Sequence, residues 1–224
     1  MIKRLLILGA VVGVSVPASA ITVVQWDFNN SLTNPSTGSG SLALQGGVVS
    51  SSASGSGSTD AGSPNNSINT ATYPAQGTGS GTAGIAFFTD TTGFQNVSVT
   101  WDQRLSNTAS LNWAVEYTTD GSTWNAFSTY QGIGTTTFFN NNSADFSSIT
   151  GVNNNANFGF RFVSIFAPGG AGYVANGSTS TYGTTGTSRW DMVTVNADVV
   201  PEPATMGLLA AAGLGIAARR RRKS

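Results

Sequence analysis

The side chains able to do chemistry in this 224-residue chain are few, because it contains no histidine and no cysteine. Histidine is the commonest general base and metal ligand, and a serine–histidine–aspartate triad cannot form without it. Without cysteine, no disulfide holds the fold. Carboxylates and aromatic rings are therefore the groups on which a binding or catalytic function would depend.

Two aspartates near opposite ends of the body predict a cation site. Asp27 stands in WDFNN and Asp191 in RWDMV, and the first and last strands of a β-sandwich are often neighbours. With Asn29 they would offer oxygens to a calcium shell of about six to eight ligands. The one cofactor to consider is thus a structural calcium ion held by Asp27, Asn29 and Asp191. The alternative is that Asp191 caps a strand or pairs with Arg189 or Arg161.

Glu116 is the only glutamate between residues 21 and 200. Together with Asp102 it would resemble the acid–base pair of a glycosidase. In the predicted strand, however, Glu116 alternates with apolar residues and so lies on the polar face, where a carboxylate is ordinarily exposed to solvent. No Gly-x-Ser-x-Gly nucleophile elbow is present. The sequence therefore favours a protein that is not an enzyme.

Three aromatic residues lie in or beside turns and are the candidates for ligand binding: Trp124, Tyr173 and Tyr182. Exposed aromatic rings stack on sugar faces, while neighbouring amides and carboxylates bind hydroxyl groups. The alternative is that these rings cover loop edges or complete the core.

The neutral formal charge of the whole chain conceals an acidic body. Seven of the ten basic residues lie in its two ends. Residues 21–200 keep Arg104, Arg161 and Arg189 against nine carboxylates, a net charge of −6. Because nucleic-acid binding needs clustered lysine and arginine, we expect no nucleic-acid partner.

Short segments that alternate apolar and polar residues predict strands throughout the body. Residues 157–166 place three phenylalanines on one face, residues 94–101 show the same period, and Asp120-Gly121 predicts a hairpin turn. We therefore predict one all-β domain over residues 21–199, an antiparallel, jelly-roll-like β-sandwich.

Two polar regions of the body are low in complexity. Residues 50–83 are rich in serine and glycine and are predicted to form a flexible loop. A flat ice-binding face would need threonines at a fixed repeat. The threonine-rich runs at 135–137 and 178–188 show no such repeat.

The first 20 residues have the three regions of a secretory signal peptide. Lys3 and Arg4 precede an apolar run, and Pro17-Ala18-Ser19-Ala20 follows it. We expect cleavage after Ala20, with Ala18 and Ala20 as the small residues of the cleavage site.

The last 25 residues, 200–224, combine a rigid Pro-Glu-Pro, an uncharged run over 204–218 and a basic end. As a helix the run would span roughly 22 Å, less than a hydrocarbon core of roughly 30 Å. Such a short transmembrane helix suits temporary retention, with the arginines on the cytoplasmic side. The residues of this segment that would be recognised are Pro201, Glu202, Pro203, Arg219, Arg220, Arg221 and Arg222.

This tail resembles the PEP-CTERM sorting signal of Gram-negative bacteria, which exosortase peptidases recognise. The resemblance implies export, a transient anchor in the inner membrane, a cut near Pro201-Glu202-Pro203 and delivery to the cell surface or extracellular polysaccharide. Some proteins with this tail carry ice-binding labels, so that function is a further alternative.

Three fragments of the body, 115–127, 157–166 and 188–197, resemble the jelly-roll or galactose-binding-like sandwiches used as carbohydrate-binding modules. We therefore predict a secreted, surface-sorted, non-enzymatic protein of the envelope or extracellular polysaccharide matrix. Its partners would be an exosortase-like peptidase and polysaccharide. The alternatives are a dedicated carbohydrate-binding module and an ice-binding protein.

Overall fold

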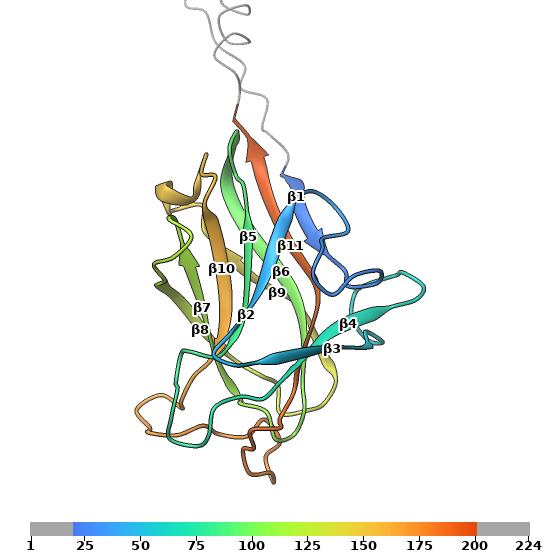
Figure 1. Cartoon of the computed structure of the whole chain (residues 1–224), viewed down its shortest axis with the longest axis vertical. Coiled ribbons are helices and arrows are strands. Elements are labelled where there is room, and N and C mark those ends of the chain that lie inside the picture. Colours follow the sequence, from blue (N-terminus) through green and yellow to red (C-terminus); the bar gives the residue numbers. More distant parts are fainter. Residues whose placement is uncertain (1–19, 201–224) are drawn as a thin grey trace, which may run out of the picture.

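The alternating segments of the chain form strands that pack as two antiparallel sheets. The computed structural model describes residues 20–200, whose strands are arranged in two layers (Figure 1). The six-stranded sheet contains β1 (Ile21–Trp26), β3 (Val49–Ser54), β4 (Asn66–Ala71), β6 (Phe94–Leu105), β9 (Phe138–Asp145) and β11 (Ser188–Val199). The five-stranded sheet contains β2 (Gly40–Gln45), β5 (Gly84–Thr89), β7 (Asn112–Thr118), β8 (Asn125–Gln131) and β10 (Phe158–Ser164). Within residues 20–200 the one helical segment is a 3-10 turn, η1 (Thr150–Val152). The predicted all-β antiparallel sandwich is confirmed.

Strand β11 organises the six-stranded sheet, whose order is β3-β4-β11-β6-β9. One edge of β11 is shared, because Trp190 pairs with Ile68 of β4 while Val193 pairs with Trp26 of β1. The first and last strands are therefore neighbours, as the sequence predicted. Between the two pairings the strand bulges, and Met192 adopts a φ of 48°.

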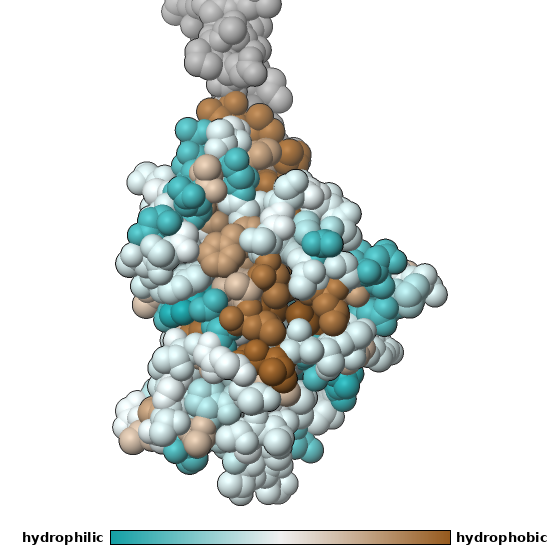
Figure 2. Space-filling model, viewed as in Figure 1, coloured by the Kyte–Doolittle hydropathy of each residue, from teal (hydrophilic) through white to brown (hydrophobic). Residues whose placement is uncertain are grey.

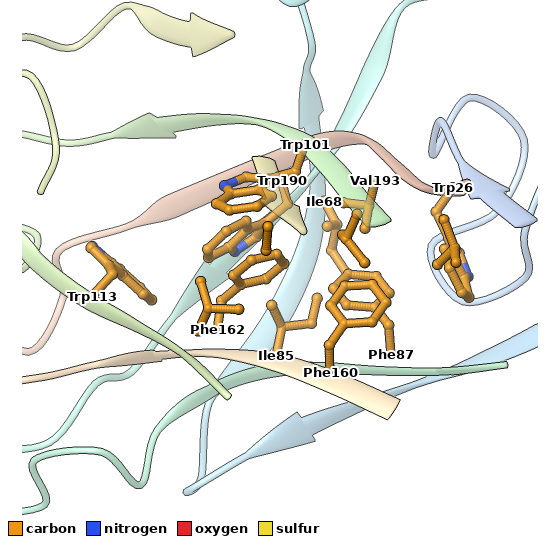
Figure 3. Packing of buried hydrophobic residues seen from close by; sticks show 14 of the residues in the cluster. Trp26, Ile68, Ile85, Phe87, Trp101, Trp113, Phe160, Phe162, Trp190 and Val193 are labelled. Atoms are coloured by element: carbon orange, nitrogen blue, oxygen red, sulfur yellow. The ribbon is translucent and has the colours of Figure 1, made fainter. Parts of the chain in front are cut away.

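The core between the sheets is built from aromatic side chains (Figure 3). Phe162 stacks on Trp190 at 4.6 Å and packs against Trp101 at 4.5 Å between ring centroids. Phe158 and Phe160 are also fully buried, as their alternation predicted. Burying a side chain of this size contributes about 1.5–3 kcal/mol, so the aromatic core holds the sheets together without a disulfide.

The polar segment 50–83 is not one loop, which corrects the sequence prediction. It contains most of β3 and all of β4, which pair with each other along their whole length from Val49↔Ala71 to Ser54↔Asn66. The sequence of β3 shows no apolar alternation. It still forms a strand because it lies at the edge of the sheet, where backbone hydrogen bonds to β4 hold it. The intervening residues 55–65 fold back over the sheet.

The first and last described residues leave the sandwich at the same end, since Ile21 pairs with Ala197 (Figure 1). Residues 20–200 contain no helix of the length and apolarity needed to cross a membrane. Ala20 is exposed next to β1. Ala18, the hydrophobic run 204–218 and the residues expected to be recognised by a peptidase lie outside the described residues.

Candidate functional site: an arginine-lined pocket

Four charged side chains form two cross-strand pairs on the outer face of the six-stranded sheet. In the register of β11 and β6, Arg189 is opposite Arg104 and Asp191 is opposite Asp102. Side chains alternate along a strand, and Trp190, between Arg189 and Asp191, points into the core. The four charges therefore point away from the core, toward the loops that cover this face.

Asp102 fixes the loop of residues 55–65 to the sheet. Its Oδ2 accepts hydrogen bonds of 2.6 Å from both the backbone N–H and the hydroxyl of Thr59. Its Oδ1 accepts a third, of 2.8 Å, from the N–H of Asn141 in β9. This carboxylate is buried and fully engaged, so its role here is structural.

Asp191 is fully buried beneath the same loop, but only half of its carboxyl group is satisfied. Oδ1 accepts the N–H of Met192, whereas Oδ2 has no hydrogen-bond partner. The buried Oδ1 of Asn65 also has none. Both oxygens lie within 2.6 Å of the point that a Cβ on Gly55 would occupy. Two acceptors thus converge on a spot that a proton or a cation would stabilise.

The surroundings of Asp191 favour its protonated form. Burial raises the pKa of the Asp191 carboxyl to about 7, although the nearby Ser58 side chain and the Met192 N–H lower it. The charges of Asp60 and Asp102 raise the pKa further. The predicted alternative, an ion pair of Asp191 with Arg189 or Arg161, does not occur within residues 20–200, where Arg161 pairs with Glu116 instead.

The predicted calcium ligands lie in one region but are mostly engaged with each other and with the loop. Asp27 Oδ1 accepts the N–H of Asn29. The Asn29 side chain donates to Asp60 Oδ2 at 2.7 Å and accepts the N–H of Asn66 at 2.8 Å. Residues 20–200 contain no group of three or more carboxylates placed to hold a metal. Among the predicted ligands only Asp191 has a buried oxygen without a partner, and calcium binding stays a prediction.

Beside the covered aspartates, the two arginines line an open pocket of about 370 Å³. Ser54, Ser56 and Gly57 line it from the end of β3 and the loop after it. On the other side it is lined by the start of β9 and the residues before it, 136–138. The pocket therefore lies where two loops meet over the sheet, with arginine as its only charged residue type.

The arginines are held by backbone carbonyls and not by acids. Arg189 Nη1 donates to the carbonyl of Ser54 at 3.1 Å, and Arg104 Nε donates to the carbonyl of Thr136. Arg189 Nε is buried without a partner. Neither guanidinium lies within ion-pair distance of a carboxylate in residues 20–200. Burial lowers the pKa of Arg189, and the charge of Arg104 lowers it further.

Trp124 lies on the opposite side of the molecule, on the outer face of the five-stranded sheet. Its half-buried ring packs against Phe88 at 5.8 Å and lies 4.5 Å from the guanidinium carbon of Arg161. Arg161 in turn forms an ion pair with Glu116, with Nη2 and Oε2 2.5 Å apart. Glu116 and Asp102 belong to different sheets and have different partners, so they do not form the acid–base pair of a glycosidase.

The two tyrosines hold loops together. Tyr173 is buried, and its ring stacks on Tyr182 with centroids 4.5 Å apart. The hydroxyl of Tyr182 donates to the carbonyl of Pro74 at 2.8 Å. Trp124 keeps some exposed ring surface, whereas Tyr173 does not. Sugar stacking by these three residues stays a prediction.

Residues 199–222 match the family described as the PEP-CTERM protein-sorting motif. The chain carries a PEP-CTERM sorting motif. This confirms the predicted resemblance of the tail. The motif begins where the fold ends, because β11 stops at Val199 and the N–H of Val200 donates the last backbone hydrogen bond, to Gly93.

No curated protein matches the chain. Solved structures that resemble it include a xylan-binding domain from CBM 22, with 8% identity, a TM-score of 0.47 and coverage of 81% of this chain and 97% of that one. The C-terminal family 22 carbohydrate-binding module of Clostridium thermocellum Xyn10B has 8% identity, a TM-score of 0.46 and coverage of 80% and 94%. The K1 cleaved adhesin domain of Lys-gingipain from Porphyromonas gingivalis W83 has 13% identity, a TM-score of 0.37 and coverage of 83% and 94%.

The PEP-CTERM tail was visible in the sequence, but the arginine pocket was not. From the sequence, Arg189 was considered only as a possible ion-pair partner of Asp191, and no role was predicted for Arg104. The signal that existed was scarcity, since the body contains only three basic residues. The convergence of two of them, Arg104 and Arg189, depends on the register of β6 against β11, which no local pattern specifies.

Proposed function

We propose that this protein is a non-enzymatic component of the extracellular polysaccharide matrix of a Gram-negative bacterium. The observation that carries the proposal is the sorting motif at residues 199–222. In this scheme the signal peptide directs export, and the short helix holds the protein in the inner membrane. An exosortase-like peptidase then cuts near Pro201-Glu202-Pro203.

The boundary of the fold supports such a cut. The last strand ends at Val199, so cleavage after it would leave every strand of the sandwich intact. The end of the sandwich beside the motif is also apolar, with Ile21, Val199 and Val200 between 37% and 47% exposed. Figure 2 shows hydrophobic atoms at this end and a second group around β2, on a face that is otherwise mostly hydrophilic or neutral. An apolar end suits a protein held against a membrane before release.

The carboxylates considered for catalysis support a role without catalysis. Asp102 is engaged by Thr59 and Asn141, and Glu116 is neutralised by Arg161. Contact with polysaccharide would instead use the half-exposed ring of Trp124 and the arginine pocket. A dedicated carbohydrate-binding module is the second candidate, and that pocket is the observation that favours it.

Ice binding receives no comparable support. In the run 135–137, Thr135 and Thr137 hydrogen-bond to each other, 2.8 Å apart, in the connection before β9. Both threonines are exposed, but they lie in an irregular connection, whereas a flat ice-binding face would need hydroxyl groups repeated at a fixed period.

The sorting step is tested by replacing the glutamate of the motif. We expect Glu202→Gln to stop processing, so that the chain stays in the membrane fraction at its uncut mass. Wild type should be released in a strain that has an exosortase and retained in a matched strain without one. Asp198→Asn removes the same charge four residues earlier and should be released normally. Release of Glu202→Gln at the wild-type mass would overturn the assignment.

A further inference from the structure

The arginine pocket has an energetic peculiarity. Like charges directly opposite each other in a sheet are destabilising, and Arg104 and Arg189 are opposite each other in the register of β6 and β11. No carboxylate within residues 20–200 pairs with either of them. Two of the three cations of the body therefore share one site, where their repulsion is uncompensated. A bound anion would remove that repulsion.

The donors of the pocket suit an oxyanion. Each arginine uses one N–H group on a backbone carbonyl, of Ser54 or Thr136, which orients the guanidinium and leaves other donors for a ligand. Arg189 Nε is buried and has no partner. A planar guanidinium binds carboxylate through two parallel hydrogen bonds, and two guanidinium groups can bind both of its oxygens.

The size and lining of the pocket favour a sugar that carries the anion over an inorganic ion alone. A volume of about 370 Å³ is at the small end of the range for ligand pockets, about 300–1,000 Å³. Four residues with hydroxyl side chains line the pocket together with the arginines: Ser54, Ser56, Thr136 and Thr137. Hydroxyl groups can both donate to and accept from the hydroxyls of a sugar ring.

The charge of the rest of the body adds selectivity. Its net charge of −6 repels an acidic polymer from most of the surface. The third arginine, Arg161, is neutralised by Glu116. An acidic chain would therefore be attracted mainly where Arg104 and Arg189 meet.

We propose that the pocket between Arg104 and Arg189 binds the carboxylate of a uronic acid in an acidic polysaccharide. The source of this ligand, an extracellular matrix, rests on the proposed function above. The binding chemistry rests on the pocket alone. The site would let the released protein hold acidic matrix strands by their charged sugars.

The test measures binding of an oligogalacturonate to the full chain, purified in detergent, by titration calorimetry. We expect saturable binding that weakens as salt rises, and at least tenfold weaker binding of the methyl-esterified oligomer, which has the same rings without the charge. A sulfated oligosaccharide and inorganic phosphate are the other arms. Tighter binding of either one than of the galacturonate would overturn the assignment to a uronic acid.

Variants connect the binding to the pocket. Arg104→Gln and Arg189→Gln should each weaken binding at least tenfold, and the double variant should abolish it. Arg161→Gln removes the same charge from the other sheet and should bind as wild type does. Arg104→Lys and Arg189→Lys keep the charge without the planar fork, should weaken binding less, and serve if a glutamine variant fails to fold. Wild-type affinity in the folded Arg104→Gln and Arg189→Gln proteins would overturn the proposal.

The outcomes separate this proposal from the proposed function. Glu202→Gln tests sorting and should bind the galacturonate normally. Normal release of a protein that binds none of the three anionic probes would overturn the pocket proposal and leave the sorting intact. Galacturonate binding by a chain that no exosortase releases would overturn the proposed sorting and leave the pocket proposal intact.

Discussion

The arginines on the outer faces of the two sheets differ in whether an acidic residue pairs with them. On the five-stranded sheet, Arg161 lies against Trp124 and is neutralised by Glu116 at 2.5 Å. On the six-stranded sheet, Arg104 and Arg189 face each other without an acid, although Asp102 and Asp191 stand two residues away. Those aspartates are instead covered by the loop of residues 55–65. Arg161, which is paired with an acid, is consistent with a structural role. Arg104 and Arg189, which have no acidic partner in residues 20–200, fit the proposed anion site.

The largest effect on stability should come from Asp102, which holds the loop of residues 55–65 over the two aspartates. Asp102→Ala leaves the N–H groups of Thr59 and Asn141 without their acceptor in a buried place. We expect a loss of about 3 kcal/mol in the free energy of unfolding, measured by chemical denaturation. Asp102→Asn keeps one acceptor and should lose less. Equal stability of wild type and Asp102→Ala would show that the loop does not depend on this carboxylate.

The next effect concerns the pH dependence that Asp191 imposes. Its pKa of about 7 in the folded protein lies above the usual 3.8, so the folded state keeps this proton after the unfolded chain has lost it. The free energy of unfolding should therefore fall as pH rises from about 4 to about 7, and then level off. Asp191→Asn should remove this fall, as followed by thermal melts across the range.

Calcium offers a second outcome for the same residue. If the cation replaces the proton between Asp191 and Asn65, added calcium should raise the melting temperature of wild type at pH 7.5, and a chelator should reverse it. Asp191→Asn should show no such shift. An identical dependence of stability on pH in wild type and Asp191→Asn would contradict the argument that burial raises the pKa of Asp191. Equal melting temperatures of wild type with calcium and with chelator would contradict the predicted calcium site.

The smallest effect compares the arginines of the two faces directly. Arg161→Gln breaks a partly buried ion pair and should cost about 1 kcal/mol of stability. Arg104→Gln and Arg189→Gln relieve a like-charge repulsion while losing one hydrogen bond each, so their stabilities should stay within about 0.5 kcal/mol of wild type. Denaturant titrations of the three variants measure the difference. A greater loss in the pocket variants than in Arg161→Gln would show that the arginine pair has a structural role.

Much of the fold followed from local patterns. The alternation in residues 157–166 was enough to place Phe158, Phe160 and Phe162 on the core face, because a strand directs every second side chain to the same side. The same rule failed for β3, whose serines form a strand without any apolar alternation. Its pairing with β4 depends on backbone groups, which every residue has, and so composition alone could not show it.

The tail was determined by the sequence itself. A sorting motif is recognised as a linear order of residues, and residues 199–222 match it as such. The pocket was decided only by tertiary structure. Arg104 and Arg189 are 85 residues apart in the chain and meet because β6 and β11 pair in one particular register. Register follows from the packing of the whole core, since a shift by one residue would turn Trp190 out of the core and Arg189 into it.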